Sequence, residues 1–234
     1  LPKAPNDISV KTIMKWIDDA RKDNITIYTD SNSIDDVVLS EIAGADGIGM
    51  FKIENFIKSD RESIAAFVQT NDEEIGIEIE NRLSSLFSDL FAATHQVVTI
   101  QLLNDSLTSY LPSPEELTEQ IATLRVQKRI LKEFDKDALL KEKEELLEAI
   151  KSIREQNPFL GLRGNRLIQI CPSLFEIQIR GILRGAKASR RRGGNPMIRV
   201  LLPLVTSEQD LVLVHNILEE VMLEVEETAE LGVS

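Results

Sequence analysis

The sequence predicts an α/β protein with parallel strands, arranged either as a barrel or as a doubly wound sheet. Three observations predict this class. Short apolar segments alternate with helical segments along the chain, as parallel strands joined by right-handed crossovers do. The segment 97–103 is apolar at nearly every position, as a strand buried on both faces is. Glycines and polar residues follow the strands at their carboxyl ends, where α/β proteins bind ligands.

The amino-acid composition is that of an ordinary globular protein, and 234 residues are enough to form one sizeable core. The formal net charge of −12 argues against binding to nucleic acid or to an anionic membrane. No apolar run reaches the roughly 18 residues of a membrane-spanning helix. One cysteine, Cys171, excludes an internal disulfide and fits a reducing compartment, so we expect a cytoplasmic protein. Because the chain begins with Leu1, we expect a processed protein or a piece of a longer one.

The first half of the chain predicts three strands separated by helices. Residues 1–9 contain two prolines and are expected to form a linker before a single domain of residues 10–234. Ser33 offers a capping hydroxyl at the start of a helix that Gly44 ends. The spacing of apolar residues, their alternation with polar residues and the glycine content predict the remaining elements. In order, they are a helix at 10–22, a strand at 25–30, a helix at 34–43, a strand at 47–51, helices at 56–71 and 78–94, and a strand at 97–103.

The second half predicts a helical insertion and two further strand–helix units. Residues 115–156 carry apolar stripes interrupted near residue 134, which predicts a helical hairpin after the third strand. Coiled-coil pairing of this hairpin with a partner is the alternative, although the stripe is short. The stretch Asn157–Ala186 holds an arginine between two glycines, a placement that can aim positive charge at an anion. The remaining elements are strands at 158–162 and 197–205 and helices at 172–189 and 207–230.

Four blocks resemble, in order, the motifs of the phosphoenolpyruvate-utilising enzymes, most closely the C-terminal domain of the pyruvate, phosphate dikinases. GADGIGMFKIE at 44–54 is similar to GAEGIGLCRTEH, and VTIQLLNDSLTSYLP at 98–112 is similar to VTIRLLDPPLHEFLP. The stretch 157–186 resembles NPMLGHRGCRL followed by PEIYEMQARAI, and MIRVLLPLV at 197–205 resembles IMIPLV. The resemblance therefore covers roughly residues 25–227.

The resemblance implies a (β/α)8 barrel whose strand carboxyl ends bind phosphoenolpyruvate or pyruvate. In this family a phosphohistidine on a separate domain exchanges its phosphoryl group with pyruvate. Arginines bind the phosphate and carboxylate, magnesium bridges them, and a cysteine manages the enolate proton; such chemistry needs fixed cations around developing negative charge. The implied partners are the phosphohistidine and nucleotide-binding domains of a longer chain, which no segment here resembles.

The departures from the family motifs lie at the substrate-binding positions. Lys52 stands where the family has arginine and keeps the charge without the bidentate fork. Gln101 replaces a second arginine and removes its charge, whereas Arg163 matches the family. The resemblance implies substrate binding by these three residues. The residues expected to support them are Glu54, Asn104 and Arg166.

Each of these residues also has a structural explanation. Lys52 either binds an anion or forms a salt bridge, and Gln101 either contacts ligand or hydrogen-bonds within the barrel mouth. Arg163 either binds ligand or bonds to backbone carbonyls. Cys171 does not match the family's catalytic cysteine, and we expect a buried structural thiol there. His95 and His215 have no neighbouring residues at metal-ligand spacing.

The family's metal-binding acids and catalytic cysteine would follow Gly232, so we expect no catalytic residue, no metal site and no cofactor in this chain. The first hypothesis is a piece of a dikinase-type phosphotransferase that is inactive alone. The alternative is a degenerate, non-catalytic binding or assembly module. A third is an unrelated barrel enzyme acting on a small anion. Five strand–helix units cannot close an eight-stranded barrel, and the open edges lead us to expect a homo-oligomer.

Overall fold

A computed structural model describes residues 7–21, 24–106, 109–131, 137–153 and 161–225. Its described strands form one parallel sheet in the order β1-β2-β3-β4, with bounds β1 (Tyr28–Ser31), β2 (Gly47–Lys52), β3 (Val97–Gln101) and β4 (Met197–Leu201). The predicted α/β class is confirmed. Neighbours in the sheet are consecutive in the chain, as in a barrel, whereas a doubly wound sheet reverses its order at a switch point.

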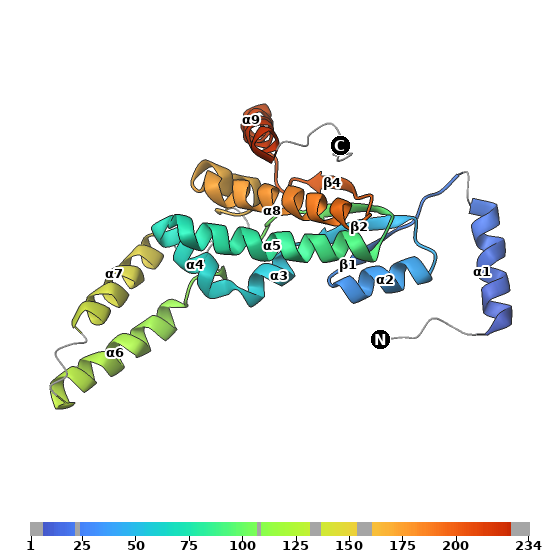
Figure 1. The fold of residues 1–234 in the computed structure, drawn as a ribbon. Coiled ribbons are helices and arrows are strands. Elements are labelled where there is room, and N and C mark those ends of the chain that lie inside the picture. Colours follow the sequence, from blue (N-terminus) through green and yellow to red (C-terminus); the bar gives the residue numbers. More distant parts are fainter. Residues whose placement is uncertain (1–6, 22–23, 107–108, 132–136, 154–160, 226–234) are drawn as a thin grey trace.

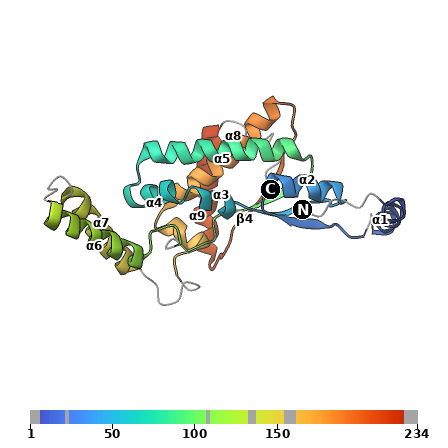
Figure 2. The same ribbon diagram turned by 90° about the horizontal axis from the view of Figure 1, so that it is seen from below.

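Helices connect the strands, and α2, α5 and α8 lie on one face of the sheet (Figures 1 and 2). The helices are α1 (Ile8–Arg21), α2 (Ile34–Ile42), α3 (Glu54–Ser59), α4 (Arg61–Thr70), α5 (Glu73–Ala93), α6 (Pro114–Leu131), α7 (Asp137–Ile153), α8 (Pro172–Arg191) and α9 (Glu208–Val225), with the 3-10 helix η3 (Gly164–Gln169) before α8. No helix in the described part of the chain combines the length and apolar character needed to cross a bilayer.

Several predicted bounds need correction. The expected helix at 56–71 is two helices, because Asp60 leaves helical geometry at φ −116° and ψ 30°. Helix α1 begins at Ile8, inside the expected linker 1–9, of which residues 1–6 lie outside the described residues. The expected strand 158–162 is not in the described sheet: residues 158–160 are not described, and Gly161 and Leu162 form a bend.

The main core lies between the sheet and the pair α5 and α8. Strand residues that face these helices, such as Ile48, Val98 and Ile198, are at most 1% exposed. Helices α5 and α8 approach closely because α8 presents glycine to α5. A Cβ atom on Gly185 would lie 2.5 Å from the Cβ of Phe87. This close contact joins α5 and α8 into one layer.

The opposite face of the sheet is covered by a tyrosine that lies across two glycines. Tyr28 pairs with Gly47, and a Cβ atom on Gly47 would lie 2.5 Å from the Cε1 of Tyr28. A Cβ atom on Gly49 would lie 2.6 Å from the Cβ of Tyr28. From β4, the Arg199 guanidinium lies 5.8 Å from the ring centroid and donates to the Tyr28 hydroxyl at 3.5 Å. This pair spans the sheet from β1 to β4.

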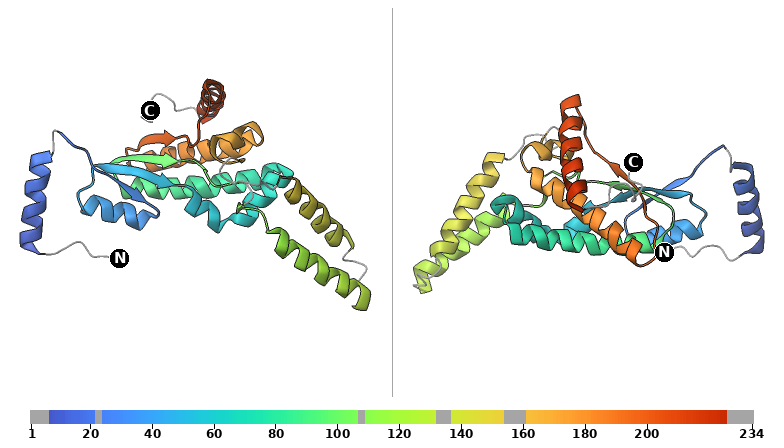
Figure 3. Two further views of the ribbon diagram at one scale, coloured as in Figure 1. Left: turned by 180° about the vertical axis from the view of Figure 1, so that it is seen from behind. Right: turned by 45° about the horizontal axis from the view of Figure 1, so that its top comes forward.

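Helices α6 and α7 form a hairpin that projects from the body after β3 (Figure 3), within the range 115–156 where the sequence predicts helices. Leu117 and Ile150 are buried at its base, in a small cluster with Leu111. At the other end of the molecule, α1 buries none of its residues. Its last residue, Arg21, forms salt bridges with Asp18 at 2.8 Å and Asp46 at 2.5 Å.

A reciprocal hydrogen-bonded cap starts α9 after β4. The Asp210 carboxylate accepts from the Thr206 nitrogen at 2.9 Å and the Ser207 nitrogen at 3.0 Å, while the Ser207 hydroxyl accepts from the Asp210 nitrogen at 3.2 Å. The hydrogen bond from the Thr206 nitrogen is the largest cause that lowers the pKa of Asp210 below 3.8. The ionised carboxylate therefore stabilises the folded state.

We predict that Asp210→Asn lowers the free energy of unfolding at pH 7 and reduces its pH dependence in acid. The carboxylate contribution is complete well above pH 3.8 and is lost as the pH falls through the lowered pKa of the folded state. Urea unfolding at several pH values between 7 and the acid limit of folding measures this. Equal acid sensitivity in the variant and the wild type would contradict the assignment.

Candidate functional site

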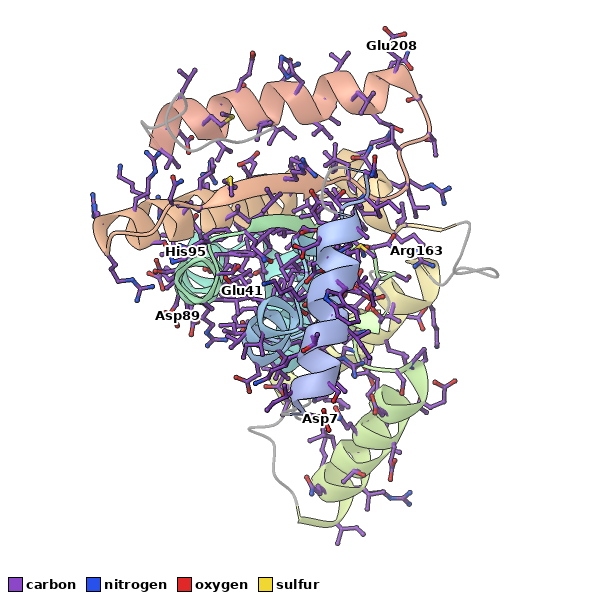
Figure 4. The ribbon with its side chains drawn as sticks, turned by 90° about the vertical axis from the view of Figure 1, so that its right-hand side faces the viewer. Asp7, Glu41, Asp89, His95, Arg163 and Glu208 are labelled. Atoms are coloured by element: carbon purple, nitrogen blue, oxygen red, sulfur yellow. The ribbon has the colours of Figure 1, made fainter. Side chains whose placement is uncertain are left out.

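The carboxyl edge of the sheet brings together the residues that the sequence assigns to substrate binding. Lys52 ends β2 and is the Cα partner of Gln101, which ends β3. Arg163 immediately precedes η3 and forms an isolated antiparallel bridge with Ser106, just after β3. His95 lies just before β3, and Figure 4 shows it on the opposite side of the view from Arg163. Lys52, Gln101 and Arg163 thus belong to one edge.

Glu54 lies at the centre of this edge. It starts α3 and is 8% exposed. Its Oε1 accepts from the Asn104 backbone nitrogen at 2.8 Å and from the Gln101 Nε2 at 3.4 Å. Glu54 therefore joins the segment after β2 to the segment after β3, and the Gln101 side chain hydrogen-bonds within the site.

Arg163 is joined to the same segment. Its Nε donates to the Asn104 carbonyl oxygen at 3.0 Å, and the Arg166 Nη1 donates to the Gly161 carbonyl oxygen at 3.2 Å. Gly164 has φ +55°, and a Cβ atom there would lie 2.9 Å from the Pro203 carbonyl oxygen, so the turn requires glycine. These contacts hold the Arg163 segment against the carboxyl end of β3 and the residues that follow β4.

Lys52 forms a salt bridge with a residue that the sequence analysis missed. Its Nζ lies 2.7 Å from the Oδ2 of Asp30 in β1. A second pair, Lys58 Nζ and Asp105 Oδ2, lies 3.1 Å apart on the segments that follow β2 and β3. Asp30 could have been found from its strand-end position beside Lys52, since parallel strands align their carboxyl ends at one edge. Each of these two lysines thus has a carboxylate partner.

The buried Tyr110 hydroxyl contacts this second pair, because it donates to the Asp105 Oδ2 at 3.4 Å. Tyr110 is 1% exposed, and burial is the largest cause that raises its pKa above the ordinary value of 10.0. The Asp105 charge raises that pKa further. Tyr110 therefore stays protonated and acts as a hydrogen-bond donor at neutral pH.

Among the described residues, no group of three His, Cys, Asp or Glu side chains is placed to hold a metal ion. The Glu54 carboxylate, the buried acid of the edge, already accepts hydrogen bonds from Asn104 and Gln101. The expectation of a buried thiol at Cys171 is wrong, because this residue is partly exposed, although it packs against the core. Cys171 lines a cavity of about 20 Å³, room for about one water molecule.

The protein is therefore a parallel α/β protein that carries cationic and amide side chains at the carboxyl edge of its sheet. Folds of this class bind small anionic ligands at that edge. Comparison with known proteins identifies the family. The sequence model of the family described as PEP-utilising enzyme, PEP-binding domain, matches residues 6–232. The chain belongs to this family.

Curated relatives agree with the family assignment. The chain is 29% identical over 223 residues to pyruvate, phosphate dikinase of Entamoeba histolytica, a match that covers 92% of this chain and 24% of the relative. It is 28% identical over 222 residues to pyruvate, phosphate dikinase 2 of Zea mays, covering 90% and 23%. With the Rhizobium meliloti enzyme it shares 29% identity over 221 residues, covering 91% and 23%. The chain thus spans about a quarter of the length of these relatives.

We predict that Glu54→Ala lowers the free energy of unfolding by about 2 kcal/mol, because it leaves the Asn104 nitrogen without its acceptor. Chemical denaturation at neutral pH measures this. The matched control is Glu142→Ala on the exposed face of α7, for which we expect a change below about 0.5 kcal/mol. Equal effects of the two substitutions would show that Glu54 does not organise the edge.

Proposed function

We propose that the chain is the phosphoenolpyruvate/pyruvate-binding part of a pyruvate, phosphate dikinase-type phosphotransferase and is inactive alone. The observation that carries the proposal is the meeting of Lys52, Gln101 and Arg163 at one carboxyl edge, in a chain that belongs to the PEP-binding family. Lys52 and Arg163 would bind the carboxylate or phosphate of the ligand, and Gln101 would donate through its amide. Glu54, Asn104 and Arg166 would hold these side chains in place.

The proposed fold is part of a (β/α)8 barrel. The sequential parallel order of β1 to β4 supports it, as does the placement of the site at the strand carboxyl ends. In this proposal residues 10–234 form one domain with 115–156 as a helical insertion, and residues 1–9 form a linker. The phosphohistidine and nucleotide-binding domains would come from a longer chain, and the single cysteine supports a cytoplasmic location.

The lack of activity in the chain alone follows from charge. Phosphoryl transfer develops negative charge that several fixed cations must meet. Here Gln101 is neutral, and the Lys52 charge is already opposed by Asp30. Magnesium, when bound in a complete enzyme of this type, would supply further positive charge to the phosphate, and the described residues contain no group of three side chains placed to hold a metal ion.

The second candidate is a degenerate, non-catalytic binding or assembly module. The pairing of Lys52 and Lys58 with carboxylates favours it, because these cations are engaged inside the chain. Pyruvate-dependent phosphoryl exchange by the longer protein would support the first candidate. Absence of exchange, with folding and self-association retained, would support the second.

We predict that the chain binds phosphoenolpyruvate with a Kd of about 1 mM, with or without magnesium, in isothermal titration calorimetry. Lys52→Gln should weaken binding about three- to tenfold because it removes one cation from the edge. Lys58→Gln is the matched control and should bind like the wild type. Micromolar binding would contradict the view that Gln101 leaves the site weak, and complete absence of binding would contradict the proposed ligand.

We predict self-association of the chain in size-exclusion chromatography with light scattering. The described sheet ends in β1 and β4, whose outer edges have no strand partner among the described residues. Unpaired edges expose backbone donors and acceptors that a second strand can satisfy. A monomer that keeps its mass across a hundredfold concentration range would contradict homo-oligomer formation.

A further inference from the structure

The salt bridge between Asp30 and Lys52 joins two neighbouring strands at the proposed binding edge. Tyr28 and Asp30 are two residues apart in β1, so their side chains share a face of the sheet. That face is the one opposite the main core, because the Tyr28 ring lies over Gly47 and Gly49. The 2.7 Å contact places the Lys52 ammonium beside the Asp30 carboxylate. Asp30 is thus a negative charge held beside the predicted ligand-binding cation.

The two lysine–carboxylate pairs of the edge differ in which lysine each carboxylate contacts. Asp30 lies 2.7 Å from the Lys52 ammonium, whereas Asp105 lies 3.1 Å from that of Lys58. Both carboxylates are partly exposed, Asp30 to 50% and Asp105 to 26%, so water and salt screen both charges. A change of charge at Asp30 should affect an anion bound to Lys52 more strongly than a change at Asp105, because Asp30 is the carboxylate in contact with Lys52.

An anion that reaches Lys52 meets the Asp30 charge at short range. The repulsion is proportional to the charge of the ligand, so it is weakest for a monocarboxylate such as pyruvate. The repulsion is several times stronger for a ligand that carries both carboxylate and phosphate, such as phosphoenolpyruvate. Asp30 consequently penalises highly charged ligands more than singly charged ones.

We propose that Asp30 is a specificity-determining residue that biases the edge toward singly charged carboxylates and against phosphate-bearing anions. The inference rests on the proposed function, because it assumes that Lys52 contacts the ligand. It adds to that function a preferred ligand charge and a residue that sets it. Asp30 acts through Lys52, so it is a positioning residue for the ammonium group as well as a source of repulsion.

The test is the isosteric substitution Asp30→Asn, which removes the charge and keeps an oxygen that can accept from Lys52. Calorimetric titrations with pyruvate and with phosphoenolpyruvate compare the variant with the wild type at low ionic strength. We expect a gain of about three- to tenfold for pyruvate and a larger gain for phosphoenolpyruvate. Added salt should reduce both gains.

Asp105→Asn is the matched control, because it removes the carboxylate from the other lysine pair of the edge and should change both affinities less than twofold. The double variant Asp30→Asn with Lys52→Gln should lose the gain. Asp30→Ser, which also removes the charge, provides a second version of the test if Asp30→Asn does not fold by circular dichroism. It should show the same order of gains.

Four results would overturn the inference. Equal affinities in the wild type and both Asp30 variants would overturn it while leaving the proposed ligand binding intact. Equal gains for pyruvate and phosphoenolpyruvate, or a gain in Asp105→Asn as large as that in Asp30→Asn, would do the same. Absence of binding of both ligands to the wild type and to the Asp30 variants would overturn the inference together with the proposed function.

Discussion

The hydrogen bond between the Glu54 carboxylate and the Asn104 nitrogen is the contact on which the candidate site depends. It connects the end of β2 to the end of β3, and the Asn104 carbonyl oxygen in turn accepts from Arg163, more than fifty residues further along the chain. A buried acid is tolerated here because donors from Asn104 and Gln101 replace the water it loses. Three segments distant in sequence are thereby held at one edge.

The same edge is nearly balanced in charge. The cations Lys52 and Lys58 each lie beside a carboxylate, and the position that the resemblance assigns to a second family arginine is the neutral Gln101. A site that binds and stabilises a phosphate needs an excess of positive charge around it. The balance seen here is the physical reason for proposing weak binding and no transfer by the chain alone.

The sequence predicted the placement of Lys52 and Gln101 because parallel strands end at a common edge, and strand ends are visible in hydrophobic patterns. Family motifs predicted Arg163 at this edge, which periodicity alone could not place. Asp30 was missed because a salt bridge depends on strand register, and the β1–β2 register shifts between Thr29 and Ser31. The helix break at Asp60 was also missed, since the apolar spacing of α3 and α4 continues through it.

The tyrosine that lies across β2 also restricts how this sheet can change by mutation. A Cβ atom at Gly47 would lie in the volume of the Tyr28 ring, and one at Gly49 would lie 2.6 Å from the Tyr28 Cβ. A side chain at Gly47 therefore requires a smaller residue at position 28, which would also remove the ring beneath Arg199, and a side chain at Gly49 requires glycine at position 28 or a shift of the backbone. Variation at positions on three different strands is therefore coupled, and the sheet tolerates joint replacements better than single ones.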